Sequence, residues 1–136
     1  FAARREHLDK VIVPALNAGR WVLCDRFTDA TYAYQSGGSG VGWNRVGVLE
    51  RWVQRGLQPD LTILFDVSLA VARRRAGRKS RPDRFERERN AYFERVRKAY
   101  LRRHRESPRR VHVIEAGRSI GEIQKELEQM LLKLCP

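Results

Sequence analysis

Short apolar runs alternate with segments of helical periodicity along this chain, and this alternation restricts the possible folds more than any other feature. The apolar runs span residues 21–24, 61–65 and 111–114. Between and around them, apolar residues recur at every third or fourth position, which is typical of amphipathic helices. Runs that are apolar throughout are typical of strands covered on both faces. The sequence therefore predicts an α/β fold with a parallel sheet and helices on both faces.

Helix breakers and capping residues predict where the helices begin and end. Pro14 predicts a kink in the first helix. The expected stops are Gly19, Gly56 and Pro108, and the expected caps are Ser68 and two capping boxes, Asp83/Glu86 and Ser119/Glu122.

Residues 36–42 read S-G-G-S-G-V-G, which predicts a flexible loop. They do not match a phosphate-binding loop, because the chain contains no G-x-x-x-x-G-K-S/T sequence. The dinucleotide-binding pattern fails as well, since starting from Gly38 and Gly40 it would need a glycine at Trp43. The sequence favours a mobile linker here.

Basic residues exceed acidic ones and gather in one segment. The chain has 136 residues, a length that suits one domain. It carries 28 Lys and Arg against 16 Asp and Glu, a net charge of +12. In the segment 73–87, only Asp83 and Glu86 oppose the basic residues Arg73, Arg74, Arg75, Arg78, Lys79, Arg81, Arg84 and Arg87. Most such runs are solvated surfaces, but this one also fits nonspecific nucleic-acid binding or a lid over a nucleoside triphosphate.

The composition argues against several classes of protein. No apolar run approaches the roughly 18 residues of a membrane span. Cys24 and Cys135 lie far apart in the sequence, which predicts free thiols in a reducing, cytoplasmic environment. No group of His and Cys residues has the spacing of a zinc site.

Acidic residues end two of the expected strands. Asp25 follows the first apolar run and Asp66 the second, and Arg26 lies beside Asp25. Ligands of open parallel sheets bind beyond these strand ends. An arginine there can pair with a phosphate through two hydrogen bonds, and an acid can hold an arginine or a hydrated magnesium ion. Taken alone, the Asp25-Arg26 dipeptide slightly favours a plain ion pair.

Residues 25–35 read D-R-F-T-D-A-T-Y-A-Y-Q, which closely resembles the thymidylate kinase signature D-R-F/Y/H-x-x-S-x-x-A-Y-Q. The sequence departs from that signature at Ala30, where the family usually has Ser. Three further segments resemble family motifs in the family's order: F-A-A-R at 1–4, P-D-L-T at 59–62 continued by F-D-V at 65–67, and D-R-F-E at 83–86. The resemblance spans nearly the whole chain.

The resemblance implies a P-loop kinase fold and transfer of the γ-phosphate of ATP, with Mg²⁺, to thymidine monophosphate. It also implies a homodimer, with neither a membrane nor a specific nucleic acid as a partner. Because the family's P-loop would precede Phe1, we expect residues 1–136 to be one incomplete nucleoside monophosphate kinase domain with a lid at about 77–82. We also expect the family's P-loop strand between 21–24 and 61–65, and an isolated chain that is inactive and poorly stable.

By position in the family motifs, the resemblance assigns the acceptor site to the first part of the chain. Arg26 would bind the substrate phosphate, with Asp25 beside it. Arg4 would read the edge of the thymine base, and Phe1 would stack on it. The remaining positions line the base and sugar pocket or adjoin it, namely Thr31, Tyr34 and Gln35.

The resemblance places the donor site and the sugar edge in the basic segment. The lid cations would be Arg78, Lys79 and Arg81, and Arg74 or Arg75 would lie along the adenine. Asp83 and Glu86 would close the sugar side, with Phe85 as a wall against a 2′-hydroxyl group.

Two other classes of function stay open at this point. The chain could be a basic nucleic-acid-binding fragment or another nucleoside monophosphate kinase. The apolar stripe Val46, Leu49, Trp52 and Val53 fits a dimer face and fits core packing equally well.

Overall fold

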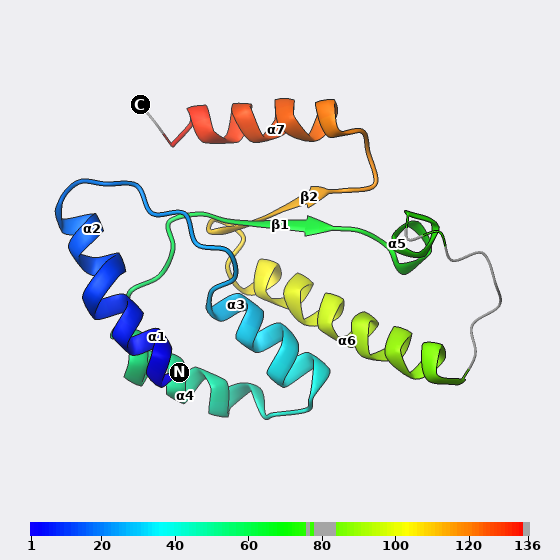
Figure 1. Cartoon of the computed structure of the whole chain (residues 1–136), viewed down its shortest axis with the longest axis horizontal. Coiled ribbons are helices and arrows are strands. Elements are labelled where there is room, and N and C mark those ends of the chain that lie inside the picture. Colours follow the sequence, from blue (N-terminus) through cyan, green and yellow to red (C-terminus); the bar gives the residue numbers. More distant parts are fainter. Residues whose placement is uncertain (76, 78–83, 135–136) are drawn as a thin grey trace.

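The computed structural model describes residues 1–75, 77 and 84–134, without the side chains of 84–87. Figure 1 shows the arrangement of the helices and strands. In chain order, the elements are α1 (Ala2–His7), the π-helix η1 (Leu8–Ile12), α2 (Val13–Asn17), α3 (Thr28–Thr31), the π-helix η2 (Tyr32–Gly38), α4 (Trp43–Gln54), β1 (Thr62–Asp66), α5 (Leu69–Arg75), α6 (Arg84–Glu106), β2 (Val111–Glu115) and α7 (Ile120–Leu132).

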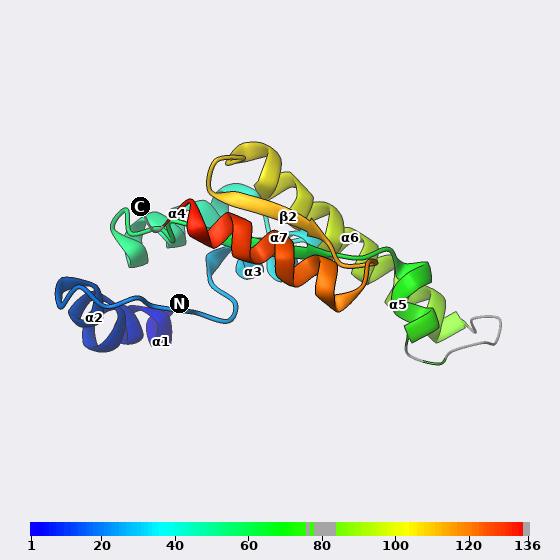
Figure 2. The same cartoon turned by 90° about the horizontal axis from the view of Figure 1, so that it is seen from above.

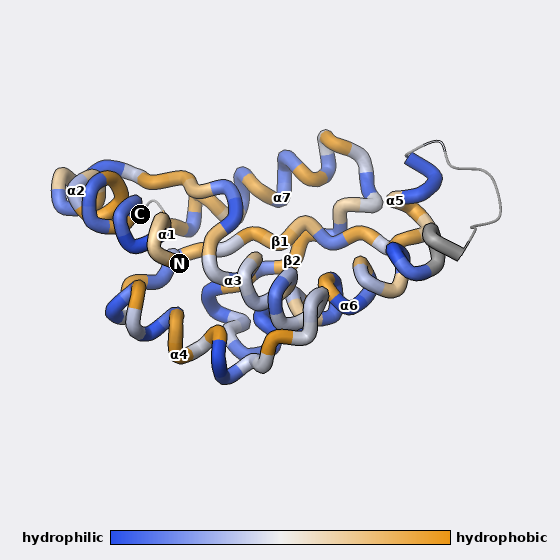
Figure 3. The backbone as a smooth tube through the Cα atoms, turned by 60° about the horizontal axis from the view of Figure 1, so that its bottom comes forward, coloured by the Kyte–Doolittle hydropathy of each residue, from blue (hydrophilic) through white to orange (hydrophobic). Residues whose placement is uncertain are grey.

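The predicted α/β layering is confirmed. β1 and β2 pair in parallel, in register from Thr62 opposite Val111 to Asp66 opposite Glu115. Helix α6 covers one face of this pair and α7 lies on the other, as Figures 1 and 2 show. Val111 and Ile114 are buried in β2, and both strands are mostly apolar in Figure 3. The two apolar runs that the sequence assigned to strands at 61–65 and 111–114 therefore build the sheet.

The strand predicted at 21–24 is wrong for the structure described here. These residues join no sheet ladder, and Trp21 and Leu23 are 73% and 102% exposed. A strand needs a neighbour whose backbone accepts and donates its hydrogen bonds. Among the described strands, β1 pairs only with β2, so the run at 21–24 has neither a ladder partner nor a covered face.

The kink predicted at Pro14 takes the form of a π-helical turn. Proline has no backbone N–H to continue the helical ladder, and Pro14 lies in the first turn of α2, directly after η1. This turn buries Leu8 and Ile12 against Val53 of α4. Gly19 ends the helix as expected, with a left-handed φ of 68°.

The loop predicted at 36–42 is wrong over residues 36–38, which belong to η2. The glycines here allow close packing. A Cβ on Gly37 would lie 2.5 Å from the Cβ of Ala99 in α6, and one on Gly38 would lie 2.6 Å from the ring of Tyr92. Backbone atoms of η2 therefore rest directly on α6.

We expect Gly37→Ala to lower the free energy of unfolding by about 2 kcal/mol, because the new methyl group overpacks a tight contact. Besides Ala99, it would meet the backbone oxygen of Arg95 at 2.9 Å, and that atom cannot rotate away. Urea denaturation measures the effect. Gly121→Ala in α7 is the matched control, since its new Cβ meets no described atom within 4 Å apart from its chain neighbours and its own helix backbone, and alanine favours a helix. Equal stability of the Gly37→Ala variant and the wild type would contradict the packing role.

Two of the predicted helix caps are confirmed. Ser68 accepts a hydrogen bond from the N–H of Val71 at 3.3 Å, and Ser119 and Glu122 form the capping box of α7. The capping box predicted at Asp83/Glu86 lies outside the described residues. Within the described part of the chain, no helix has the length and apolar composition that crossing a bilayer would require.

Candidate functional site

Helix α1 presents Arg4 to α3, where its guanidinium group is held on several sides. Nη1 donates to the hydroxyl oxygens of Thr28 at 3.2 Å and Thr31 at 3.0 Å, and Nη2 donates to the carbonyl of Phe27 at 3.5 Å. The group also lies over the rings of Phe1 and Phe27, 5.3 and 5.1 Å from their centroids. The structure therefore brings together Phe1, Arg4 and Thr31, which the sequence had assigned to one pocket.

Burial lowers the pKa of Arg4 from its ordinary value, although Cys24 and Glu50 oppose the shift. An arginine side chain keeps its charge even so. Within the described residues, the Nε of Arg4 has no acceptor, so N–H groups remain for a ligand. A partly desolvated cation with free donors binds a carbonyl or an anion more strongly than a solvated one.

Arg26 has a backbone conformation that side chains other than glycine seldom adopt. Its φ is 64°, in the left-handed region where a Cβ meets steric strain. This turn places the guanidinium group over the ring of Tyr34, 5.3 Å from its centroid. Strained residues of this kind gather at binding sites. Asp25 and Gln35, the other predicted residues nearby, are exposed.

A second aromatic ring supports Tyr34 from behind. Tyr100 of α6 packs edge-on against it, with ring centroids 6.3 Å apart. Burial, and to a lesser degree Tyr34, raises the pKa of Tyr100 to about 12, so this ring is neutral at physiological pH. Tyr100 also lines a cavity of about 330 Å³ between β1, α5 and α6.

The two guanidinium groups serve neighbouring positions of one helical run. Arg4 binds Thr31 at the end of α3, and Arg26 stacks on Tyr34, three residues later in η2. Thr31 and Tyr34 thus lie close together in the sequence, on either side of the junction between α3 and η2. The surface between them offers aromatic rings, hydroxyl groups and two cations. It suits a ligand with a planar ring at one end and a negative charge at the other.

A buried ionic network fixes the helix that carries these residues. Asp29 of α3, only 5% exposed, accepts hydrogen bonds from Arg103 at 2.8 Å and from both terminal nitrogens of Arg110 at 2.7 and 2.8 Å. Thr62 of β1 donates to it at 3.3 Å. Burial alone would raise the pKa of Asp29, but the hydrogen bonds from Arg110 and Arg103 outweigh it and lower that pKa. The network ties α3 to α6 and to the sheet.

Comparison with known proteins supplies the observation that decides the family. The family model described as thymidylate kinase matches residues 1–127. The chain belongs to the thymidylate kinase family. The thymidylate kinase of Cupriavidus necator is 58% identical over 131 residues, which are 96% of this chain and 64% of that protein. That of Burkholderia cenocepacia is 56% identical over 134 residues, covering 98% and 65%.

A solved structure agrees with the sequence comparison. The crystal structure of thymidylate kinase from Ehrlichia chaffeensis superposes with a TM-score of 0.73 at 30% identity, covering 96% of this chain and 60% of that chain. The chain thus has a P-loop-kinase-like α/β fold. It spans about two thirds of the length of the relatives that it matches (64% for that of Cupriavidus necator).

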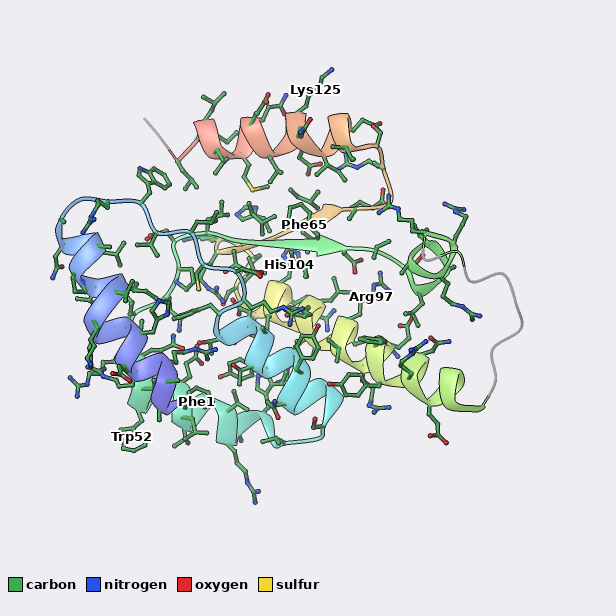
Figure 4. The ribbon with its side chains drawn as sticks, viewed as in Figure 1. Phe1, Trp52, Phe65, Arg97, His104 and Lys125 are labelled. Atoms are coloured by element: carbon green, nitrogen blue, oxygen red, sulfur yellow. The ribbon has the colours of Figure 1, made fainter. Side chains whose placement is uncertain are left out.

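Not every position that the thymidylate kinase motifs single out is free to bind a ligand. Arg97 of α6 donates to both carboxylate oxygens of Asp66, at 2.6 and 2.7 Å, and Figure 4 shows its side chain beside the end of β1. Arg75 donates to the carbonyl of Arg118 at 3.3 Å, and Arg74 is exposed in the last turn of α5. Asp66 is therefore committed to an ion pair.

Several predicted residues lie outside the described part of the chain. These are Arg78, Lys79, Arg81 and Asp83, together with the side chains of Phe85 and Glu86 in the first turn of α6. Whether the lid cations face Arg26 therefore stays a prediction.

Sequence reasoning missed residues that support the site from behind. Thr28 and Asp29 lie within the thymidylate kinase signature, which was the available signal, but no role was assigned to either. Tyr100 was not singled out from the sequence either. Gln54 gave no signal, because its partner Thr28 lies 26 residues away in the sequence.

Proposed function

We propose that this protein transfers the γ-phosphate of ATP to thymidine monophosphate, giving thymidine diphosphate. The observation that carries the proposal is the pairing of two held guanidinium groups along one helical run, with Arg4 on Thr31 and Arg26 on Tyr34. Membership of the thymidylate kinase family supports the choice of substrate.

In this proposal, the described residues form the acceptor site. Arg26 pairs with the phosphate of the nucleotide, a geometry that a planar guanidinium group suits. Arg4 donates to a carbonyl at the edge of the thymine, and Phe1 stacks on the base. Thr31 and Tyr34 line the base and sugar pocket, with Asp25 and Gln35 beside it, and Asp83, Phe85 and Glu86 close the sugar side.

The donor side involves the basic segment. We propose that residues 77–82 form a lid whose cations, Arg78, Lys79 and Arg81, neutralise the charge on the transferring phosphoryl group. Arg74 and Arg75 would lie along the adenine. Among the described residues, no cluster of His, Cys, Asp and Glu is arranged to hold a metal ion. We propose that Mg²⁺ binds together with the phosphates of ATP, since this ion usually takes only one or two carboxylates from the protein.

The proposal extends to assembly and location. We propose a homodimer that forms through α4 in the cytoplasm. Val46 and Val53 are buried and serve the core, whereas Val48, Leu49 and Trp52 are exposed, and Figure 4 shows Trp52 on the outer side of α4. The exposed free thiol of Cys24 is consistent with a reducing compartment.

Binding measurements test the acceptor site directly. We expect this chain to bind thymidine monophosphate at least tenfold more tightly than thymidine, because the phosphate adds charge-assisted hydrogen bonds. We expect it also to prefer thymidine monophosphate over uridine monophosphate. Isothermal titration calorimetry with the three ligands measures both ratios. Equal affinity for thymidine and its monophosphate would contradict a phosphate site.

Turnover tests the reaction itself. The N-terminal segment of the Cupriavidus necator relative, joined ahead of Phe1, should give ATP-dependent phosphorylation of thymidine monophosphate. Equal rates with uridine monophosphate would count against the thymidylate assignment.

A further inference from the structure

A buried chain of hydrogen bonds runs from the end of α4 to Arg4. Gln54, the last residue of α4, is 3% exposed, and its Nε2 donates to the carbonyl of Leu57 at 2.8 Å. Only the nitrogen of the amide can donate to a carbonyl, so Oε1 faces the opposite side. There it accepts a hydrogen bond from the hydroxyl group of Thr28, which is 1% exposed.

The direction of these hydrogen bonds determines whether the hydroxyl group of Thr28 donates to Arg4 or accepts from it. A threonine hydroxyl has one proton and two acceptor lone pairs. Since the proton goes to Gln54, only lone pairs face the guanidinium group, and Nη1 of Arg4 donates to them at 3.2 Å. Every link therefore points one way, from Arg4 through Thr28 and Gln54 to the carbonyl of Leu57.

We call this series of hydrogen bonds, from Arg4 through Thr28 and Gln54 to Leu57, the relay. Its two ends are fixed relative to each other. Arg5, next to Arg4 in α1, donates to the carbonyl of Val53 at 2.9 Å. Val53, next to Gln54 in α4, is buried with Leu8 of η1, directly after α1, and Leu57 packs on the same cluster. The relay thus lies where α1 docks on α4, and Gln54 meets Thr28 from a rigid frame.

We propose that Gln54 is a positioning residue for base recognition, which acts on Arg4 through Thr28. The inference rests on the proposed function, in which Arg4 reads the thymine edge. Thymine presents an acceptor, O4, where cytosine presents an amino donor. A guanidinium group whose inward N–H groups are already bound to Thr28 and Thr31 keeps its remaining donors aimed outward, so it favours thymine and repels cytosine.

The test uses the full chain and removes the relay at each link in turn. Gln54→Met keeps the approximate size but removes both polar groups, and Thr28→Val removes the hydroxyl group, whereas Thr28→Ser restores it. Gln58→Met is the matched control, since Gln58 is exposed and its side chain, within the described part of the chain, donates to Glu50 at 2.7 Å. Circular dichroism establishes which variants fold.

The first readout is the ratio of the dissociation constants of deoxycytidine monophosphate and thymidine monophosphate. We expect Gln54→Met and Thr28→Val to reduce this ratio about tenfold, the effect of one hydrogen bond to a charged group. Thr28→Ser and Gln58→Met should leave it within about twofold. An unchanged ratio in folded Gln54→Met, with the wild type selective, would overturn the inference and leave the proposed function standing.

The second readout needs no nucleotide. In the free chain, ¹⁵N NMR of the Arg4 side chain should show restricted rotation of the guanidinium group in the wild type and faster rotation in Gln54→Met. Equal rotation in the two proteins would overturn the relay. If rotation differs but the wild type binds neither nucleotide, the result supports the relay and overturns the proposed function.

Discussion

Replacing Arg26 by alanine is expected to weaken binding of thymidine monophosphate by at least about a hundredfold while leaving the affinity for thymidine within about twofold. The side chain would supply two charge-assisted hydrogen bonds to the phosphate, each worth about 1.5–3 kcal/mol, and a factor of ten in affinity corresponds to about 1.4 kcal/mol. Calorimetric titration of the variant with both ligands measures the two affinities. Comparable losses for thymidine and thymidine monophosphate would show that Arg26 supports the pocket in general and does not contact the phosphate.

The control for this experiment is a second arginine whose backbone has a left-handed conformation. Arg26 and Arg55, with φ of 64° and 50°, are the described residues other than glycine with positive φ. Arg55→Ala removes a cation from the same kind of backbone position and should leave both affinities unchanged. Arg26→Gly should lose phosphate binding as the alanine variant does, yet raise the free energy of unfolding by about 1 kcal/mol, because glycine adopts this conformation without strain. Urea denaturation separates the two effects.

Asp29→Asn is expected to lower the free energy of unfolding by about 3 kcal/mol, the largest effect on stability that we anticipate. The substitution keeps the shape but takes from Arg110, whose side chain is only 14% exposed, the carboxylate that compensates its burial. Arg103, which is 11% exposed, loses the nearest of its carboxylate partners and keeps Glu50 and Glu106. The matched control is Asp9→Asn, which breaks an exposed pair with Arg5 and should cost less than about 1 kcal/mol. Equal costs in the two variants would contradict a buried network.

The pH dependence of stability gives the same network a second test. Because Asp29 has a lower pKa in the folded protein than in the unfolded chain, its stabilisation is fully present above the unfolded value of about 3.9. That stabilisation is lost as the pH falls below this value and through the folded pKa. The wild type should therefore lose more stability than Asp29→Asn between about pH 5 and pH 2. Parallel pH profiles of the two proteins would rule out this contribution.

Elements governed by local signals could be predicted from the sequence. Ser119 and Glu122 begin α7 as expected, because both partners of a capping box lie in the same turn. The apolar runs at β1 and β2 formed strands because each has the other as a neighbour. The run at 21–24 is equally apolar but has no described neighbour. Whether it forms a strand depends on pairing, which composition does not encode.

The candidate site also has a part that could be predicted from the sequence and a part that could not. Arg4, Arg26, Thr31 and Tyr34 could be predicted because they belong to contiguous motifs. Their supports could not, since the contacts that define them join distant segments. Arg103 reaches Asp29 across 74 residues, and only the folded chain shows that pairing. The glycines at 37 and 38 were misread for a related reason. Glycine suits a flexible loop and a tight helix contact equally well, and only the helix opposite them decides between the two.

The contact of η2 with α6 has a mechanical consequence. At Gly37, backbone of one helix meets the Ala99 side chain and the Arg95 backbone of the other, so no long side chain is available there to absorb a small shift. Close-packed interiors transmit displacement in such cases. Movement at the start of α6, directly after residues 77–82, would be passed on to the turn that carries Tyr34. Helices η2 and α6 would therefore move together, and the ring of Tyr34 would carry this movement to the guanidinium group of Arg26 above it.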